Sequence, residues 1–160
     1  MSEDLVKSYW PRMVRAASGY EANPALRDEL AQEMAFAVWR GLAQFQGESS
    51  VNTYIYRIIH NVAVDHIRRA SRQPQTEQQD DLVADHQCPE HLLTHAQQHS
   101  QLLAAVQQLP MSLRQVMLLK LEDLSNIEIG ETLGLSESNV GVRLNRGKQQ
   151  LTELMRKGSV

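Results

Sequence analysis

The 160-residue chain is poor in several residue types, and each shortage excludes a class of protein. Its one cysteine, Cys88, excludes an internal disulfide and a cysteine-rich zinc site, and it fits a reducing cytoplasm. Aromatic residues make up 5% of the chain, and its eight glycines and five prolines supply few turns, which argues against a β-sandwich or β-barrel. The longest apolar run, at residues 34–39, is far shorter than the roughly 20 residues of a membrane span. We therefore expect neither membrane insertion nor a signal peptide.

The net charge of −3 hides an uneven distribution along the chain. Residues 57–72 and residues 137–157 each carry a net charge of +3, and residues 77–90 between them carry −5. Two basic segments on either side of an acidic one suggest two contacts with one polyanion. Ordinary solvated helix faces would give the same counts, so charge alone leaves the partner open.

The first 72 residues have the apolar spacing of helices. A stripe over residues 5–17 predicts a first helix. Asn23, followed by a proline, predicts the N-cap of a second helix that runs to about residue 43. Residues 46–50 break the pattern as a loop, and a third helix is expected over residues 51–71.

Residues 73–90 differ from both ends of the chain. The stretch from Gln73 to Asp81 contains no apolar residue, and Pro89 closes the segment. Such a composition is typical of a linker, which would reach up to ~60 Å if extended. We therefore predict an all-α protein of two small helical domains, residues 1–72 and 91–160, joined by a flexible acidic linker at residues 73–90.

The C-terminal part has clearer helix boundaries. A helix over residues 90–108 is expected to end before Pro110. Two pairs with the spacing of a capping box, Ser112 with Gln115 and Ser125 with Glu128, predict the starts of the next two helices.

Gly134 is expected to end the second of these helices, and Ser136 to cap the last one. A short helix at residues 126–133, a three-residue turn and a longer helix at residues 137–155 have the spacing of a helix-turn-helix.

The last helix of this motif has two different sides. At about 100° per residue, its apolar side holds Val140, Leu144, Leu151 and Leu154, with Gly147 permitting close packing. The opposite side offers groups that bind base edges and phosphates, a valine that can touch a thymine methyl, and free N–H groups at the helix start. These predict a duplex-binding face of Ser136, Ser138, Asn139, Val142, Arg143 and Arg146. The alternative is a plain amphipathic surface helix.

The third helix carries a polar stripe of a different kind, made of Tyr54, Arg57, Asn61, Asp65, Arg68 and Arg72. It combines an aromatic ring for base stacking, an amide and a carboxylate for base edges, and arginines for phosphates. That combination suits single-stranded or melted nucleic acid. The same spacing also fits a salt-bridged surface.

Three segments together resemble one family. Residues 45–69, FQGESSVNTYIYRIIHNVAVDHIRR, strongly resemble the promoter-melting segment of bacterial sigma factors of the small extracytoplasmic-function (ECF) group. Residues 28–33 are similar to that family's polymerase-clamp-binding helix. The pairs at 109–110 and 128–129 and residues 140–147 resemble its C-terminal helix-turn-helix. The similarity covers nearly all of the chain outside the linker, in the family's order. The family often has Trp at the position of Tyr54, usually has Phe at that of Ala35, and usually has Lys-Ser in place of the pair at 141–142.

The resemblance implies a sigma factor, not an enzyme, that directs core RNA polymerase to promoters, helps to melt them, and needs no cofactor or metal. Its partners would be the β′ clamp helices, the β flap, promoter DNA and an anti-sigma factor. The implied polymerase contacts are Asp28, Glu29, Gln32 and Glu33. The implied minus-ten contacts are Tyr54, Arg57, Asn61, Asp65 and Arg68, with Gly47, Glu48 and Ser49 in a loop that receives a flipped base. The duplex-binding face of the last helix would read the minus-thirty-five element.

Two other interpretations remain. His86, Cys88, His91, His95 and His99 cluster in and after the linker, which would suit a metal-sensing regulator or, less well, a zinc hydrolase. A dimeric helix-turn-helix repressor would explain the C-terminal part but leaves the stripe of the third helix unused. Transcription with core polymerase separates the sigma factor from both.

Overall fold

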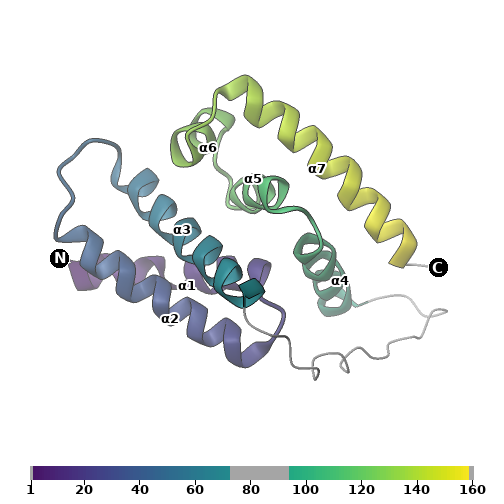
Figure 1. Cartoon of the computed structure of the whole chain (residues 1–160), viewed down its shortest axis with the longest axis horizontal. Helices are drawn as coiled ribbons and strands as arrows, with labels where there is room; N and C mark the ends of the chain where they lie inside the picture. The colour runs from purple at the N-terminus through teal and green to yellow at the C-terminus, as the bar shows by residue number, and fades with distance from the viewer. Residues whose placement is uncertain (1, 73–93, 159–160) are drawn as a thin grey trace.

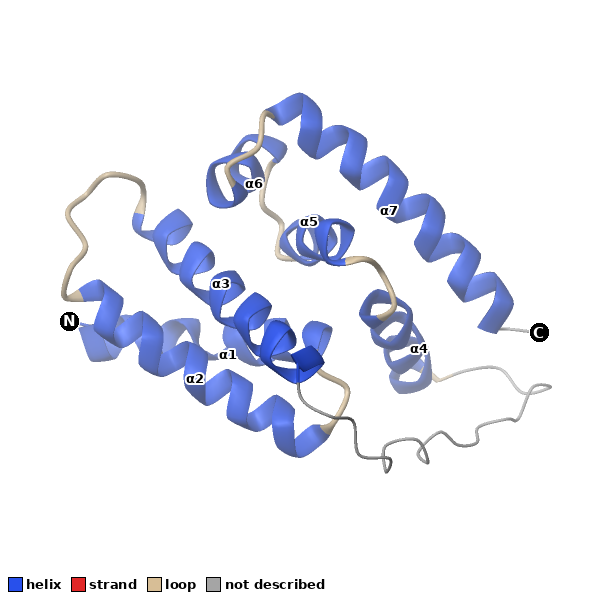
Figure 2. Cartoon of the chain, viewed as in Figure 1, coloured by secondary structure: helices blue, strands red, loops and turns tan. Residues whose placement is uncertain are grey.

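The computed structural model describes residues 2–72 and 94–158 (Figures 1 and 2). Within these ranges the chain is all-α, as predicted, with no strand. The helices are α1 Ser2–Tyr20, α2 Pro24–Leu42, α3 Val51–Arg72, α4 His95–Gln107, α5 Met111–Leu121, α6 Asn126–Leu133 and α7 Glu137–Gly158. Helices α1 to α3 form one half of the molecule and α4 to α7 the other, with α7 along its outer edge (Figure 1).

Several helix boundaries follow from the capping residues that predicted them. The side chain of Asn23 accepts hydrogen bonds from the N–H groups at positions 25 and 26, with the proline at the first helical position of α2. Ser125 and Glu128 form the reciprocal capping box of α6. Gly134 ends α6 in the left-handed conformation, with φ of 75°. The helix-turn-helix spacing of α6 and α7 is therefore confirmed.

Two predicted helix starts are wrong. Helix α4 begins at His95 rather than residue 90, because Thr94 has extended backbone and forms a capping box with Gln97. The capping box predicted at Ser112 and Gln115 does not form, because α5 begins two residues earlier than that box requires, with Pro110 as its N-cap. The carbonyl of Pro110 accepts the first backbone bonds of α5, so Ser112 is already inside the helix.

The hydrophobic core is one continuous cluster that runs from α1–α3 into α4–α7. Tyr9, Met13 and Ala17 of α1 are buried as their helical spacing predicts. Trp10 and Val14, on the other flank of the same apolar stripe, are exposed. The predicted linker lies outside the described residues, and none of the described helices has an apolar stretch that would reach across a bilayer.

Candidate nucleic-acid interface

The polar face of α7 is open to solvent. Its predicted contacts Ser136, Ser138, Asn139, Val142 and Arg146 are exposed, and Arg143 is half-buried at the flank. The hydroxyl of Ser136 accepts a hydrogen bond from the N–H of Asn139 at 3.1 Å, which caps the helix.

The apolar side of α7 packs closely on α5. Val140 and Leu144 are buried, and a Cβ on Gly147 would lie 2.9 Å from the Cγ and Sδ of Met117. This fixed packing leaves the side chains of the opposite side pointing away from the rest of the protein, where a duplex could reach them.

The stripe on α3 is less open than the face of α7. Asn61, Asp65 and Arg68 are exposed, as a contact surface requires. Tyr54 is half-buried: its hydroxyl donates to the carbonyl oxygen of Gly41 at 2.7 Å, and its ring centre lies 4.7 Å from that of Phe45. The ring is therefore held between the end of α2 and the following loop. Arg72 ends α3, and its side chain lies outside the described part.

Arg57 is bound by the other half of the chain. Its Nη2 donates to the carbonyl oxygen of Glu131 at 2.8 Å, and its Nε to that of Thr132 at 3.4 Å. These carbonyls belong to the last turn of α6, whose C=O groups have no partner within the helix. A guanidinium at a helix C-terminus is also favoured by the helix dipole. Arg57 thus caps α6 from α3.

The loop between α2 and α3 holds the residues expected to receive a flipped base. Gly47 has φ of +78°, a conformation that a side chain would strain. Gly47 and Glu48 are exposed, and Ser49 is half-buried with its hydroxyl donating to the carbonyl oxygen of Ser50. The loop therefore presents these groups at the molecular surface next to the start of α3.

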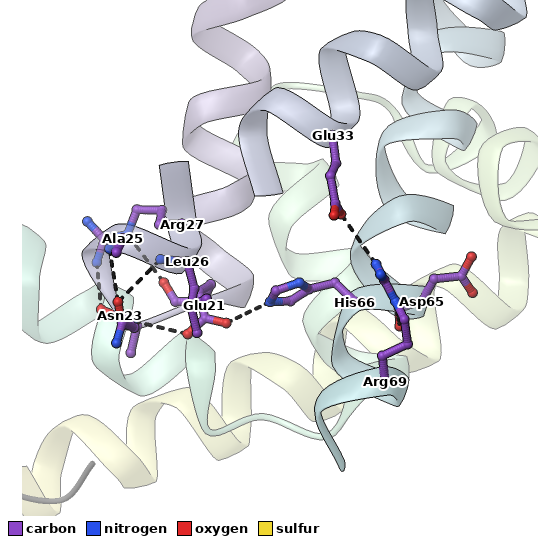
Figure 3. A network of polar contacts seen from close by, with 10 residues as sticks. Glu21, Asn23, Ala25, Leu26, Arg27, Glu33, Asp65, His66 and Arg69 are labelled. Atoms are coloured by element: carbon purple, nitrogen blue, oxygen red, sulfur yellow. Dashed lines mark hydrogen bonds and ion pairs between the residues drawn. The ribbon is translucent and has the colours of Figure 1, made fainter. Parts of the chain in front are cut away.

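Helix α2 exposes all four predicted polymerase contacts, Asp28, Glu29, Gln32 and Glu33. A carboxylate oxygen of Glu33 lies 3.3 Å from Arg69 Nη2 of α3 (Figure 3). One turn further on, Phe36 and Trp39 are 56% and 49% exposed and stack on each other with ring centres 6.2 Å apart.

Sequence reasoning missed this aromatic pair. Both residues lie in the apolar run at residues 34–39, whose composition alone indicates no contact surface. The helical spacing of Phe36 from Gln32 and Glu33 would have placed it on the polar face of α2.

Two polar pairs, one buried and one half-buried, hold α3 against the end of α1. The hydroxyl of Tyr20 and Nδ1 of His60 share a hydrogen bond of 2.5 Å. Burial raises the pKa of Tyr20, so the hydroxyl keeps its proton, and burial lowers the pKa of His60 to about 4, so the imidazole is neutral at pH 7. Further along, His66 Nε2 lies 2.7 Å from a Glu21 carboxylate oxygen (Figure 3). These contacts fix the rotation of α3, and with it the direction of its polar stripe.

The metal-binding hypothesis gains nothing from the described residues. His95 and His99 are exposed on α4, while His86, Cys88 and His91 lie outside the part that the structure describes. Among the described side chains no three His, Cys, Asp or Glu residues are grouped as a metal ion would require.

Comparison with known families finds a match in each of two segments of the chain. Residues 5–73 match the family Sigma-70 region 2, and residues 99–151 match Sigma-70, region 4. The first segment contains α2 and the stripe of α3, and the second contains the helix-turn-helix.

Curated relatives extend over nearly the whole chain. The ECF RNA polymerase sigma factor SigE of Mycolicibacterium smegmatis is 31% identical over 98% of this chain, which spans 62% of that protein's length. SigW and YlaC of Bacillus subtilis are 25% and 28% identical, and the chain spans 88% and 92% of their lengths.

Solved structures share the fold at lower identity. The sigma factor RpoE of Bartonella quintana, in complex with the anti-sigma factor NepR, superposes with a TM-score of 0.71 at 19% identity, covering 96% of each chain. CnrH, in complex with the cytosolic domain of CnrY, superposes with a TM-score of 0.69 at 21% identity, covering 98% of this chain and 88% of CnrH.

A region 2 segment followed by a region 4 helix-turn-helix is the domain pattern of the sigma factors, a family of non-enzymatic transcription initiation factors. The chain belongs to the sigma-70 family, in the ECF group.

Proposed function

We propose that this protein is a sigma factor that binds core RNA polymerase, directs it to particular promoters and helps to open the DNA. The observation that carries the proposal is the presence, in one chain, of two nucleic-acid surfaces of different chemistry. The α7 face has the amides and arginines that read a duplex, and the α3 stripe has the ring, amide and carboxylate that suit an unpaired strand. A repressor needs only the first of these.

In this role the α3 stripe and the loop before it would bind the minus-ten element. Asn61 and Asp65 would bind base edges, Arg57 and Arg68 would bind phosphates, and Tyr54 would stack on a base. The loop residues Gly47, Glu48 and Ser49 would receive a base extruded from the duplex, a step that costs a few kcal/mol.

The α7 face would bind the minus-thirty-five element as duplex. Arg146 and Asn139 are exposed near the middle and the start of that face, so we assign base contacts to them. Arg143 is half-buried beside the apolar side, which suits a grip on the phosphate backbone. Ser136, Ser138 and Val142 would complete the contact.

The exposed face of α2 would bind core polymerase. Its first half is acidic and polar, with Asp28, Glu29, Gln32 and Glu33, and its second half carries the stacked aromatic pair. A basic or polar clamp surface with an apolar patch fits this arrangement. Further proposals are contact of the C-terminal part with the β flap, control by an anti-sigma factor, a cytoplasmic location, and no catalytic activity of the chain itself.

Transcription in vitro with core polymerase tests the proposal. We expect promoter-dependent run-off transcripts from a genomic fragment library only when the protein is added to core enzyme. Because Glu33 also pairs with Arg69, Glu29→Lys is the cleaner variant for the clamp contact. It should weaken binding to core polymerase, and the loss should be smaller at high salt. A protein that binds a duplex but yields no transcripts with core would instead be a repressor.

A further inference from the structure

Val142 differs from its neighbours on the polar face of α7. Those neighbours are exposed and polar: Ser138, Asn139, Asn145, Arg146 and Gln149. Val142 is 45% exposed and is the one exposed large apolar side chain in the described part of α7. At an exposed helical position valine is less favourable than alanine, lysine or glutamine, because its branched side chain loses rotamer freedom. The stability of the helix therefore does not account for a valine at this position.

The packing of α7 fixes the direction in which Val142 points. Val140 and Leu144 are buried in the core, and Gly147 lies against Met117 of α5. At about 100° per residue, Val142 lies within about 15° of the direction opposite to the centre of this buried side. Its side chain therefore occupies the middle of the outward face, where a duplex bound to α7 comes nearest.

The residue before Val142 leaves the helix backbone open on its flank. A Cβ on Gly141 would lie in open space, with nothing within 4 Å, so the packing of the protein gives no reason for a glycine there. Glycine in a helix interior is also destabilising relative to alanine. The missing side chain suits a ligand that approaches the second turn of α7 closely, beside Val142.

The major groove of DNA presents an apolar group on one base. Thymine carries its C5-methyl there beside an O4 acceptor, whereas cytosine carries an amino group and no methyl. The two methyl groups of a valine can contact the thymine methyl. They are held ready for it, because a β-branched side chain in a helix has one strongly preferred rotamer. The amino group of cytosine against the same valine would lose its hydrogen bonds to water without a replacement.

We propose that Val142 is a specificity-determining residue that contacts the methyl group of one thymine in the upstream duplex. The proposal deepens the proposed function and rests on it for the role of the α7 face. Arg146 lies one turn beyond Val142, about 6 Å along the helix axis, and successive base pairs are about 3.4 Å apart. The thymine therefore lies within about two base pairs of the base that Arg146 contacts.

Uracil in place of thymine tests the contact, because it removes only the methyl group and leaves the base pairing unchanged. Binding of the full-length protein with core polymerase is measured on promoter duplexes in which each thymine of the upstream element in turn is replaced by uracil. We expect one replacement to weaken binding about fourfold, the effect of burying one methyl group, and the others to have no effect. An upstream element in which every thymine tolerates uracil, or which contains no thymine, would overturn the proposal.

Substitution of Val142 assigns the methyl effect to this side chain. In Val142→Ala the same uracil replacement should have almost no effect, because the alanine side chain ends short of the base. Helix content should be unchanged, since position 142 is exposed. Val14→Ala, at a valine of α1 that is 37% exposed, removes the same two methyl groups elsewhere and should keep the wild-type response to uracil. An undiminished response in Val142→Ala would assign the contact to another residue and overturn the proposal.

Methylated cytosine separates the methyl group from the rest of the thymine base. A C·G pair at the sensitive position should weaken binding more than uracil does, because the cytosine amino group then lies against the valine without a partner. 5-Methylcytosine should regain about fourfold over cytosine in the wild type, but not in Val142→Ala. Equal binding of the two cytosines by the wild type would contradict a methyl contact.

The proposed function and the thymine contact fail in different ways. If the protein yields no transcripts with core polymerase from any fragment, the proposed function fails. Duplexes selected from a random library by the full-length protein alone then take the place of the promoter. The same uracil series, on the wild type and on Val142→Ala, decides the thymine contact in either case.

Discussion

The polar face of α7 and the polar stripe of α3 carry similar groups, but the fold presents them differently. On α7, a cap at Ser136 and close packing at Gly147 fix the helix, and the opposite side meets only solvent. On α3, Tyr54 is held by the end of α2, and Arg57 is bound by α6. In the proposed function, the α7 face reads intact duplex and can be complete in advance. The α3 stripe would meet its ligand only after the DNA opens, and in the free chain Arg57 has an intramolecular partner instead.

The largest difference between the two faces is expected when the exposed part of the α3 stripe is removed, and the effect is measured on transcription. The double substitution Asn61→Ala and Asp65→Ala should lower run-off transcription from a linear duplex promoter by about 100-fold, because extrusion of a base costs a few kcal/mol. On a template with a pre-melted bubble the loss should be much smaller, since that cost no longer has to be met. Equal losses on both templates would show that these residues bind the open strand, or support the fold, rather than the opening step.

The second prediction concerns the pH dependence of stability, and it rests on the buried His60 of α3. His60 is buried and neutral with a pKa of about 4, whereas in the unfolded chain it takes up a proton near pH 6.5. Between these two pH values the unfolded state therefore binds more protons than the folded state. As a result, the free energy of unfolding falls by up to about 3 kcal/mol as the pH is lowered from 6.5 to 4. Denaturant unfolding at a series of pH values measures this slope.

His60→Gln is the control for that slope. The glutamine amide can still form a hydrogen bond with Tyr20, because it both donates and accepts, but it does not titrate in this range. The pH dependence of stability between 6.5 and 4 should be shallower in this variant than in the wild type. An unchanged slope would assign the effect to the carboxylates of the protein instead.

On the polar face of α7, the two arginines are expected to have different roles in DNA binding, and single substitutions distinguish these roles. Arg146→Ala should cost about 1–3 kcal/mol in binding to the upstream element and relax base preference at one position. Arg143→Ala should weaken all sequences alike and lower the salt slope by about one unit. Binding of the full-length chain to single-base variants of the element, at several salt concentrations, distinguishes them. If the two results are exchanged, the helix lies in its groove with a different rotation.

Local signals predicted most of this architecture, and long-range contacts account for the rest. The helix-turn-helix followed from Ser125, Glu128 and Gly134, because caps and a left-handed glycine act within a few residues. The stripe of α3 followed from helical spacing alone. The engagement of Arg57 by α6 joins positions 74 and 75 residues apart, and no local pattern contains it. The contacts of Glu122 could not be predicted from local sequence either, because its hydrogen-bond donors, Arg15 and Tyr56, lie on α1 and α3.

The smallest expected effect is the contribution of helix capping to stability. Two serines, one that caps a helix and one that does not, form a matched pair to measure it. Ser125 and Ser112 each precede an acid or amide by three residues, as a capping box requires, but only Ser125 forms the box. Its hydroxyl accepts a hydrogen bond from the N–H of Glu128, and its own N–H donates to the Glu128 carboxylate. Ser125→Ala should therefore lower the free energy of unfolding by about 1 kcal/mol. Ser112→Ala, inside α5 and exposed, should be neutral or slightly stabilising because alanine is the better helix former. Equal losses in the two variants, measured by denaturant unfolding, would mean that α5 begins at residue 113 with Ser112 as its cap, and that the pattern rather than the observed boundary was right.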